Sequence, residues 1–375
     1  MRKRRGELRV AKKLLSLLLI FVLAASATAC GKETESTSNS AADNSGGASE
    51  DSTAAESSEA SDAEDSDDAV AQDGELTTVR MSILSTGSQL WIKVINDHTK
   101  IFEKYGIDLQ TSEYSMGINT ADALVTGEID IGILADYAAA NRFGNTAVNT
   151  DFRIIAQSSN STTSNIYAPA EIENPKDLEG KHVTTISATI FDYWYAKFFE
   201  TYEVDASTVT LDGVTAAAEG LAIAKAGTSY AQWASGDTAK KLQDDYGWHQ
   251  INDDSFNIKT YTIWIANNTW ATANHDTLVK FLEASDEALQ YLNDNQDEVA
   301  GWVSEETGED EALVKASIAA NVDKLQFEQG CYDALQAVNA YCLENGNYTT
   351  EYDFKDFINI DALKEAFPDR VTYQE

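Results

Sequence analysis

Between residues 77 and 266 short strand-like runs alternate with helix-like runs, and this alternation constrains the fold more than any other feature of the sequence. Residues 77–84, 107–113 and 129–134 predict strands, and residues 90–105 and 120–126 predict the helices between them. Strands that are separated by helices form a mainly parallel sheet with helices on both faces. The sequence therefore predicts an α/β fold.

The alternation pauses and then resumes in the second half of the chain. Two strand-like runs within residues 153–167 flank the polar stretch 157–165. The elements predicted beyond this pause are strands at residues 181–186, 209–211 and 260–266, helices at residues 191–202 and 216–226, and a mainly helical segment from residue 276 onward. About 300 residues follow residue 76, which is enough chain for two ordinary domains.

The N-terminus has the pattern of a secretory signal. A basic segment precedes the apolar run 14–23, which spans about ten residues and is too short to cross a membrane. Residues 27–29 are small and lead into Cys30-Gly31, which resembles the bacterial lipobox, although Ala27 stands where leucine is usual. We expect residues 1–29 to be a signal peptide and Cys30 to carry palmitate-type lipid on the extracellular face of a Gram-positive cell membrane. The alternative is an ordinary secretion signal with an incidental cysteine.

The segment 30–76 has almost no apolar content. Val70 is the one large apolar residue between residues 31 and 75, and the rest is mostly Ser, Ala, Thr, Gly, Asp and Glu. Such a segment buries too little surface to offset its ordering entropy, so we expect a disordered acidic tether, or alternatively a binder of cations or of a basic partner. The formal net charge of -35 favours solubility and argues against nucleic-acid binding.

The two remaining cysteines, Cys331 and Cys342, fall in one predicted helix. Their spacing corresponds to about 16 Å along a helix, whereas the Cα atoms of a disulfide lie within about 7 Å. We therefore expect two buried free thiols. No Cys-x-x-Cys or paired-histidine spacing occurs, so neither a structural metal nor a cofactor is expected.

Four segments in a fixed order resemble one known family. They are Gly106-Ile107-Asp108-Leu109, the helix-to-strand run at residues 123–132, the run Asn174-Pro175-Lys176-Asp177-Leu178-Glu179-Gly180-Lys181-His182-Val183 and the strand at residues 261–268. Together they resemble the solute-binding proteins of the nitrate, taurine and alkanesulfonate ABC importers. The resemblance extends from about residue 77 to at least residue 285.

The resemblance implies a type II periplasmic-binding-protein fold, in which two α/β lobes hold a ligand between them. Lobe 1 would comprise residues 77–167 plus 261–375, with a helical C-terminal segment, and lobe 2 residues 168–260. The implied function is to capture a small organic solute or monoanion, of the sulfonate or nitrate type or a heterocycle, and to deliver it to the transmembrane subunits of an ABC permease. The protein would be a monomer.

Ligands of open α/β sheets bind beyond the carboxyl ends of the strands, so the turns that follow the predicted strands are the candidate site. Hydroxyl groups and free N–H groups at helix starts bind polar acceptors, and aromatic rings stack on flat or cationic ligands. The candidate ligand-binding residues are Gln89, Trp91, Ser115, Asn119, Asp136, Tyr137, Ser187, Thr189, Trp194, Asp212 and Trp233.

Each candidate has a structural alternative. The hydroxyl and amide residues also suit helix N-capping, Asp136 and Asp212 suit turns or a cationic ligand, and Trp194 shares a helix with core aromatic residues. None of the candidate turns contains arginine, which argues against a doubly charged anion. Tyr230 stands where the family usually has an acid, which implies altered ligand chemistry.

Two other classes of function compete with solute binding. An enzyme would need a reactive constellation, but the four histidines are scattered and no nucleophile, zinc or phosphate-loop motif occurs. We therefore expect no enzymatic activity and no catalytic residues. A surface sensor or protein-docking lipoprotein with the same fold remains an alternative.

Overall fold

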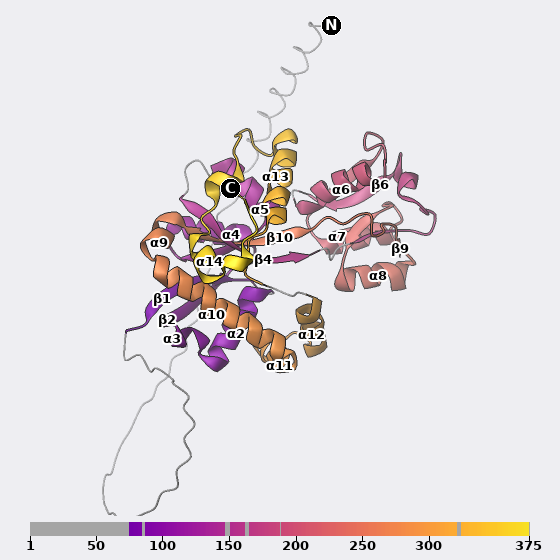
Figure 1. The fold of residues 1–375 in the computed structure, drawn as a ribbon. Coiled ribbons are helices and arrows are strands. Elements are labelled where there is room, and N and C mark those ends of the chain that lie inside the picture. Colours follow the sequence, from indigo (N-terminus) through magenta and orange to yellow (C-terminus); the bar gives the residue numbers. More distant parts are fainter. Residues whose placement is uncertain are drawn as a thin grey trace, which may run out of the picture. The chain divides into compact units, whose positions relative to one another are not determined.

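The computed structural model describes residues 75–84, 87–146, 151–161, 165–187, 189–320 and 324–374. The predicted signal peptide, Cys30 and nearly all of the predicted tether lie outside these residues. All described residues belong to one compact unit, Asp68–Glu375. Within this unit the strands form two separate five-stranded sheets, A and B (Figure 1).

Sheet A has the strand order β2-β1-β3-β10-β4. Its strands are β1 (Thr77–Ile83), β2 (Ile107–Glu113), β3 (Ile131–Ala135), β4 (Phe152–Ser161) and β10 (Thr260–Asn267). Strand β1 pairs in parallel with β2 and β3, whereas β10 is antiparallel to β3 and β4. The predicted strands at residues 77–84 and 107–113 are present, and the sheet is mixed because β10 returns from sheet B in the opposite direction.

Helices cover sheet A. They are α2 (Ser88–Thr99), α3 (Ile101–Lys104), α4 (Gly117–Thr126), α5 (Asp136–Thr146), α9 (Asn268–Ala273), α10 (His275–Asp294), α11 (Gln296–Thr307), α12 (Glu311–Ala320), α13 (Gln329–Glu344) and α14 (Asp361–Ala366), with short turns η3 (Phe354–Phe357) and η4 (Pro368–Arg370). The single helix predicted at residues 90–105 is two helices, because Lys100 has a left-handed φ of 58° and the side chain of Asn96 accepts a bond from the Phe102 N–H. Helix α5 was not predicted.

The core of sheet A explains the apolar run at β3. Ile131 and Leu134 are fully buried, as is Trp264 on the neighbouring strand β10. A Cβ on Gly132 would lie 2.9 Å from the end of the Leu124 side chain, so a larger residue here would force the buried Leu124 to shift.

Sheet B has the strand order β7-β6-β8-β5-β9. Its elements are β5 (Asn165–Ala168), η2 (Pro175–Leu178), β6 (His182–Ile186), α6 (Ile190–Thr201), β7 (Thr210–Val214), α7 (Ala217–Lys225), β8 (Gln232–Ala234), α8 (Gly236–Tyr246) and β9 (His249–Gln250). Strand β6 is parallel to β7 and β8, and β5 is antiparallel to β8 and β9. Neither β8 nor α8 was predicted.

The chain passes between the sheets twice, from β4 to β5 and from β9 to β10. The fold is therefore two-lobed, with lobe 1 around sheet A and lobe 2 around sheet B. The sequence predicted the first lobe boundary after residue 167, but β5 pairs with β8 and β9 of sheet B, so we propose that Asn165–Ala168 belongs to lobe 2.

Cys331 and Cys342 both lie on α13, and both are buried and free, as predicted. Among the described residues no helix is long and apolar enough to cross a membrane.

Candidate ligand-binding site

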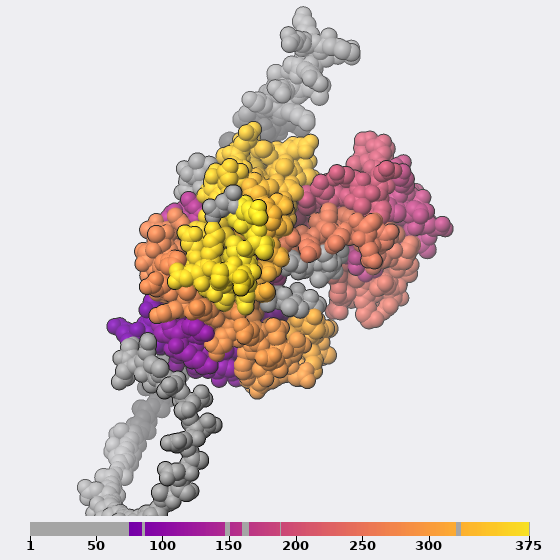
Figure 2. Space-filling view, in the orientation of Figure 1, coloured from indigo at the N-terminus to yellow at the C-terminus, as the bar shows by residue number. Residues whose placement is uncertain are grey.

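The carboxyl ends of β1, β2 and β3 lead into the first turns of α2, α4 and α5, at one edge of sheet A. The same edge is where β10 arrives from lobe 2, because Thr262 pairs with Ala135 at the end of β3. In lobe 2, β6, β7 and β8 lead into α6, α7 and α8. Figure 2 shows the surface hollowed between the elements of the two sheets, and we call this hollow the cleft.

Asp136 is the central residue of the sheet A edge. It is 1% exposed, and its carboxylate accepts the N–H of Tyr137 at 2.7 Å and the N–H of Tyr261, on the arriving strand β10, at 3.0 Å. Burial raises the pKa of this carboxyl to about 6, although both backbone bonds lower it. Asp136 thus joins the start of α5 to the crossing strand without a positively charged partner among the described side chains.

Three tyrosines from three helices surround this point. Tyr193 on α6 packs edge-on against Tyr341 on α13 with ring centroids 5.3 Å apart, so a contact joins the two lobes. Tyr137 on α5 is buried, and its hydroxyl oxygen accepts a bond from the Asn347 side chain at 2.9 Å. We call Tyr137, Tyr193 and Tyr341 the tyrosine cluster.

The charges that act on the tyrosine cluster are mainly negative. Burial and the Asp136 carboxylate raise the pKa of Tyr193 to about 12, and burial together with Asp192 raises the pKa of Tyr341. The Lys197 ammonium lies 6.0 Å from the Tyr193 ring centroid. The tyrosine hydroxyl groups therefore stay neutral at physiological pH and keep an O–H proton that can be donated.

The predicted residues Trp194 and Trp233 lie together in lobe 2. Their rings are 5.4 Å apart, and Trp233 also contacts Tyr195, Phe198 and Phe256. Trp233 lies within β8 rather than in a turn, and it is 3% exposed. The Nε1 atoms of both tryptophans are buried and have no hydrogen-bond partner among the described residues. Unpartnered buried donors are rare in native proteins, but Trp264 in the core of sheet A has one as well, so the two N–H groups are candidate donors rather than evidence of a site.

On sheet A, Gln89 and Trp91 lie in the first turn of α2, and both are 2% exposed. The Gln89 Oε1 atom accepts a long bond from Ser82 at 3.4 Å, whereas its Nε2 atom is buried and has no partner among the described residues. Gln89 therefore has a buried donor without a described partner, and Trp91 packs in the core.

The four predicted hydroxyl and amide residues lie at helix starts. Ser115 is exposed and donates to Asn119 at 3.2 Å. Thr189 is the N-cap of α6, where its hydroxyl accepts from the Phe191 N–H at 3.4 Å. Ser187 is exposed in the turn after β6. Thr189 thus has the capping role that was the alternative to ligand binding. No described hydrogen bond joins any of the four residues to the tyrosine cluster.

Asp212 lies within β7, which extends beyond the strand predicted at residues 209–211. Its carboxylate is 2.9 Å from His182 Nδ1, and 40% of its side chain is exposed. The described contacts of Asp212 are thus along the face of sheet B and not in a turn.

Sequence reasoning did not include Tyr341 among the candidates. It lies on α13, far along the chain from Tyr193, and only the tertiary fold brings the two rings together. An aromatic residue beside the buried Cys342 on a helix was the only local signal, and it does not distinguish a site from a core. Among the described residues no group of His, Cys, Asp and Glu side chains has the geometry to hold a metal ion.

Solved structures with the same fold include binding proteins and an enzyme. The aliphatic sulphonate binding protein SsuA from Escherichia coli has a TM-score of 0.64 at 13% identity, covering 75% of this chain and 97% of its own. The nitrate-binding protein NrtA from Synechocystis has a TM-score of 0.54 at 15% identity, covering 78% and 88%. The desulfurization enzyme DszB has a TM-score of 0.58 at 12% identity, covering 78% and 99%. These likenesses establish the type II periplasmic-binding-protein fold.

No curated protein matches the chain. A family model described as NMT1/THI5 like matches residues 98–299, which is more than half of the sequence and spans the core of both lobes. The chain therefore belongs to the NMT1/THI5-like family.

Proposed function

We propose that this protein is the extracellular solute-binding component of an ABC importer. The observation that carries the proposal is the tyrosine cluster, because residues of both lobes meet there beside the buried Asp136. Aromatic walls with neutral hydroxyl donors suit the capture of a small solute. The solute-binding proteins among the structural neighbours support this choice over other functions of the fold.

The solute we propose is a small organic molecule or a monoanion. The candidate residues offer donors to an acceptor on the solute, namely the indole N–H groups of Trp194 and Trp233 and the amide of Gln89. Asp136 and Asp192 both act electrostatically on the tyrosine cluster and disfavour a second negative charge. This balance favours a flat heterocycle over a sulfonate- or nitrate-type monoanion.

We further propose that lipid on Cys30 anchors the protein to the outside of the cell membrane, where it meets the transmembrane subunits of its permease as a monomer. Replacement Cys30→Ala should release the protein into the medium or leave it unprocessed. Fractionation followed by mass spectrometry of the N-terminus checks this. Normal cleavage with continued cell association would contradict the anchor.

A thermal-shift screen against pyrimidines, sulfonates, nitrate, amino acids and aromatic acids tests the function. A solute at 100 times its dissociation constant stabilises the folded state by roughly 2.7 kcal/mol. The substitution Trp194→Phe keeps a ring but removes the N–H donor, so the shift should shrink at fixed solute concentration. The matched control Trp302→Phe changes a tryptophan that stacks on His98 and should leave the shift unchanged. Equal shifts in both variants would place the solute elsewhere.

The alternatives give different results in the same experiments. A protein-docking lipoprotein would bind no solute, and its deletion would leave solute uptake intact. An enzyme such as DszB would convert the bound solute, which mass spectrometry of the incubated mixture detects. Recovery of the solute unchanged, together with an uptake defect on deletion, supports the importer component.

A further inference from the structure

A second cavity lies at the opposite end of sheet A from the cleft. Its volume is about 600 Å³, within the usual range for small-molecule sites. Asn268 follows the end of β10, where Ala266 pairs with Ile131 at the start of β3. On the other side of β10, Ala266 pairs with Arg153, the second residue of β4. The cavity is therefore at the amino ends of the parallel strands, a full strand length from the tyrosine cluster.

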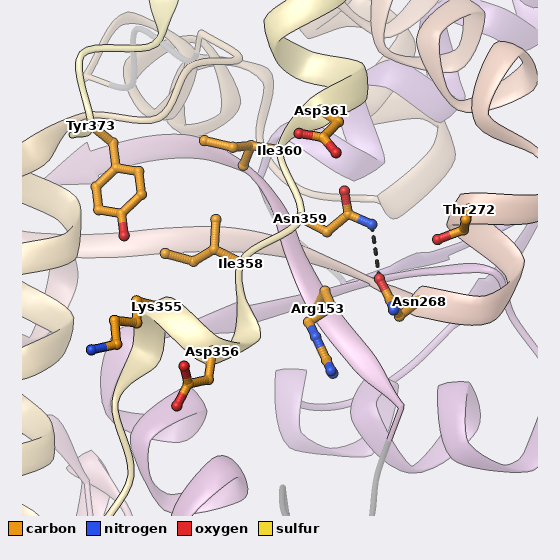
Figure 3. A pocket seen from close by; sticks show the side chains of 10 residues that line it. All are labelled: Arg153, Asn268, Thr272, Lys355, Asp356, Ile358, Asn359, Ile360, Asp361 and Tyr373. Carbon is orange, nitrogen blue, oxygen red and sulfur yellow. Dashed lines mark hydrogen bonds between the residues drawn. The ribbon is translucent and has the colours of Figure 1, made fainter. Parts of the chain in front are cut away.

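The cavity is built from two separate parts of the chain (Figure 3). One wall is formed by the ends of β4 and β10 and by Thr272 on α9, and the other by the C-terminal segment from Lys355 to Asp361 together with Tyr373. The C-terminal segment is held to β4 by a bridge between Ile154 and Ile358 and by the Asn359 N–H, which donates to Ile154 O at 2.9 Å. Backbone pairing thus forms both walls before any ligand binds.

Arg153 gives the cavity a positively charged group that is already oriented. Its guanidinium lies 5.3 Å from the centroid of the Phe357 ring, and Nη1 donates to Phe152 O at 3.0 Å. Among the described residues it forms no ion pair, whereas the nearby Lys355 is paired with Asp353 at 3.1 Å. The remaining guanidinium N–H groups are free to bind a planar acceptor in bidentate fashion.

The cavity also has a polar and an apolar side. Asn268 Oδ1 accepts the Asn359 side-chain amide at 2.8 Å, which leaves the Asn268 amide N–H groups as donors. Ile358 is half-buried and gives the cavity its apolar contact, while Ile360 and Tyr373 are almost fully buried behind it and hold that part of the wall in place. Asp356 and Asp361 also line the cavity, so a ligand with two negative charges would be repelled more strongly there than a ligand with one.

We propose that this cavity binds a small monocarboxylate with a flat apolar body. The carboxylate lies on Arg153 and the Asn268 amide, and the body lies against Ile358, which Ile360 and Tyr373 hold in place. The site is independent of the solute in the cleft.

Calorimetric titration of the full chain with benzoate tests the proposal. Benzoate should bind about tenfold or more tightly than benzamide, which has the same shape without the charge, and more tightly than the dianion phthalate. The substitution Arg153→Gln should weaken benzoate binding about tenfold or more. Lys240→Gln, which removes the same charge from an exposed side chain on α8, should leave it within about twofold.

Two further variants test the benzoate result independently, one in this cavity and one in the cleft. Asn268→Asp retains an acceptor for Asn359 and adds a negative charge, so it should weaken benzoate binding even if Arg153→Gln misfolds. Tyr193→Ala alters the cleft and should leave benzoate binding unchanged. Failure of benzoate to bind, equal binding of benzoate and benzamide, or undiminished binding by both cavity variants would overturn the proposal. Loss of binding in Tyr193→Ala would show that benzoate occupies the cleft instead.

Discussion

Asp136 in lobe 1 and Asp212 in lobe 2 differ sharply in their surroundings, although both were expected as turn residues after a strand. Asp136 is 1% exposed and accepts two backbone N–H groups, one of them from the crossing strand β10. Asp212 is partly exposed, with 40% of its side chain open to solvent, and its described ion pair is with His182. The difference shows that a crossing segment, and not the local sequence, makes one carboxylate part of the junction between the lobes.

Among the substitutions considered, the largest loss of folding free energy is expected at a buried aromatic residue, Trp233. Trp233 is buried among rings of α6 and Phe256, so Trp233→Ala should cost about 3–5 kcal/mol of folding free energy. Urea denaturation of the purified variant measures the loss. A loss below about 1 kcal/mol would mean that Trp233 does not pack in a core and would make its role entirely one of ligand contact.

Replacing Asp136 comes next in size. Asp136→Ala leaves the buried N–H groups of Tyr137 and Tyr261 without an acceptor, so it should cost about 2–4 kcal/mol. Asp212→Ala removes a solvent-exposed pair and should cost below about 1 kcal/mol. Both are compared in the same urea titration, and equal losses would remove the distinction between the two lobes.

Much of the fold was predictable because its signals are local. The strands at β1 and β2 match their predicted ranges, since a short apolar run between helix and turn residues identifies a strand without knowledge of its neighbours. Strand β8 is only three residues long and buried, and Gln232–Ala234 therefore shows no periodicity to detect. Helix α5 begins at Asp136, directly after the last residue of β3. Because no loop residues separate the two elements, there was no sequence signal for the start of the helix.

The candidate site was less predictable, because its residues meet through tertiary packing. Trp194 and Trp233 were both named from sequence, but their mutual contact depends on the pairing of β8 beside β6. Tyr341 could not be named, since its relation to Tyr193 exists only once α13 packs near α6. The residues in the turns predicted which edge of the sheet would hold the candidate site. They did not predict which side chains from other parts of the chain pack there.

The burial of Asp136 also predicts a dependence of stability on pH. Burial raises the pKa of Asp136 to about 6 in the folded chain from its ordinary value of 3.8, so the folded state binds more protons between these pH values. Its contribution to stability is present at low pH and is lost as pH rises through 6. Lowering the pH from 7 to 5 should therefore stabilise the native chain by about 1 kcal/mol relative to Asp136→Asn.

Paired denaturation curves of the native chain and Asp136→Asn at several pH values measure this difference. An Asp212→Asn variant serves as the control for loss of a carboxylate elsewhere. A difference between native chain and Asp136→Asn that stays constant from pH 7 to pH 5, or changes in the opposite direction, would contradict the assigned environment.

The smallest effect is expected outside both lobes. Deleting residues 31–73 should change the free energy of unfolding and solute affinity by less than about 0.5 kcal/mol, because this segment has one large apolar residue with which to join a core. Denaturation and solute titration of the shortened chain check this. Loss of cooperative unfolding would show that the segment is part of the fold.

Small-angle scattering of this shortened chain, with and without the solute from the thermal-shift screen, tests most directly whether both lobes hold the solute. Closure of two lobes about a few residues at element ends brings their mass together. We predict a smaller radius of gyration with solute, and loss of that change in Tyr341→Ala, which removes the contact of α13 with Tyr193. Tight binding with an unchanged radius would contradict capture between the lobes.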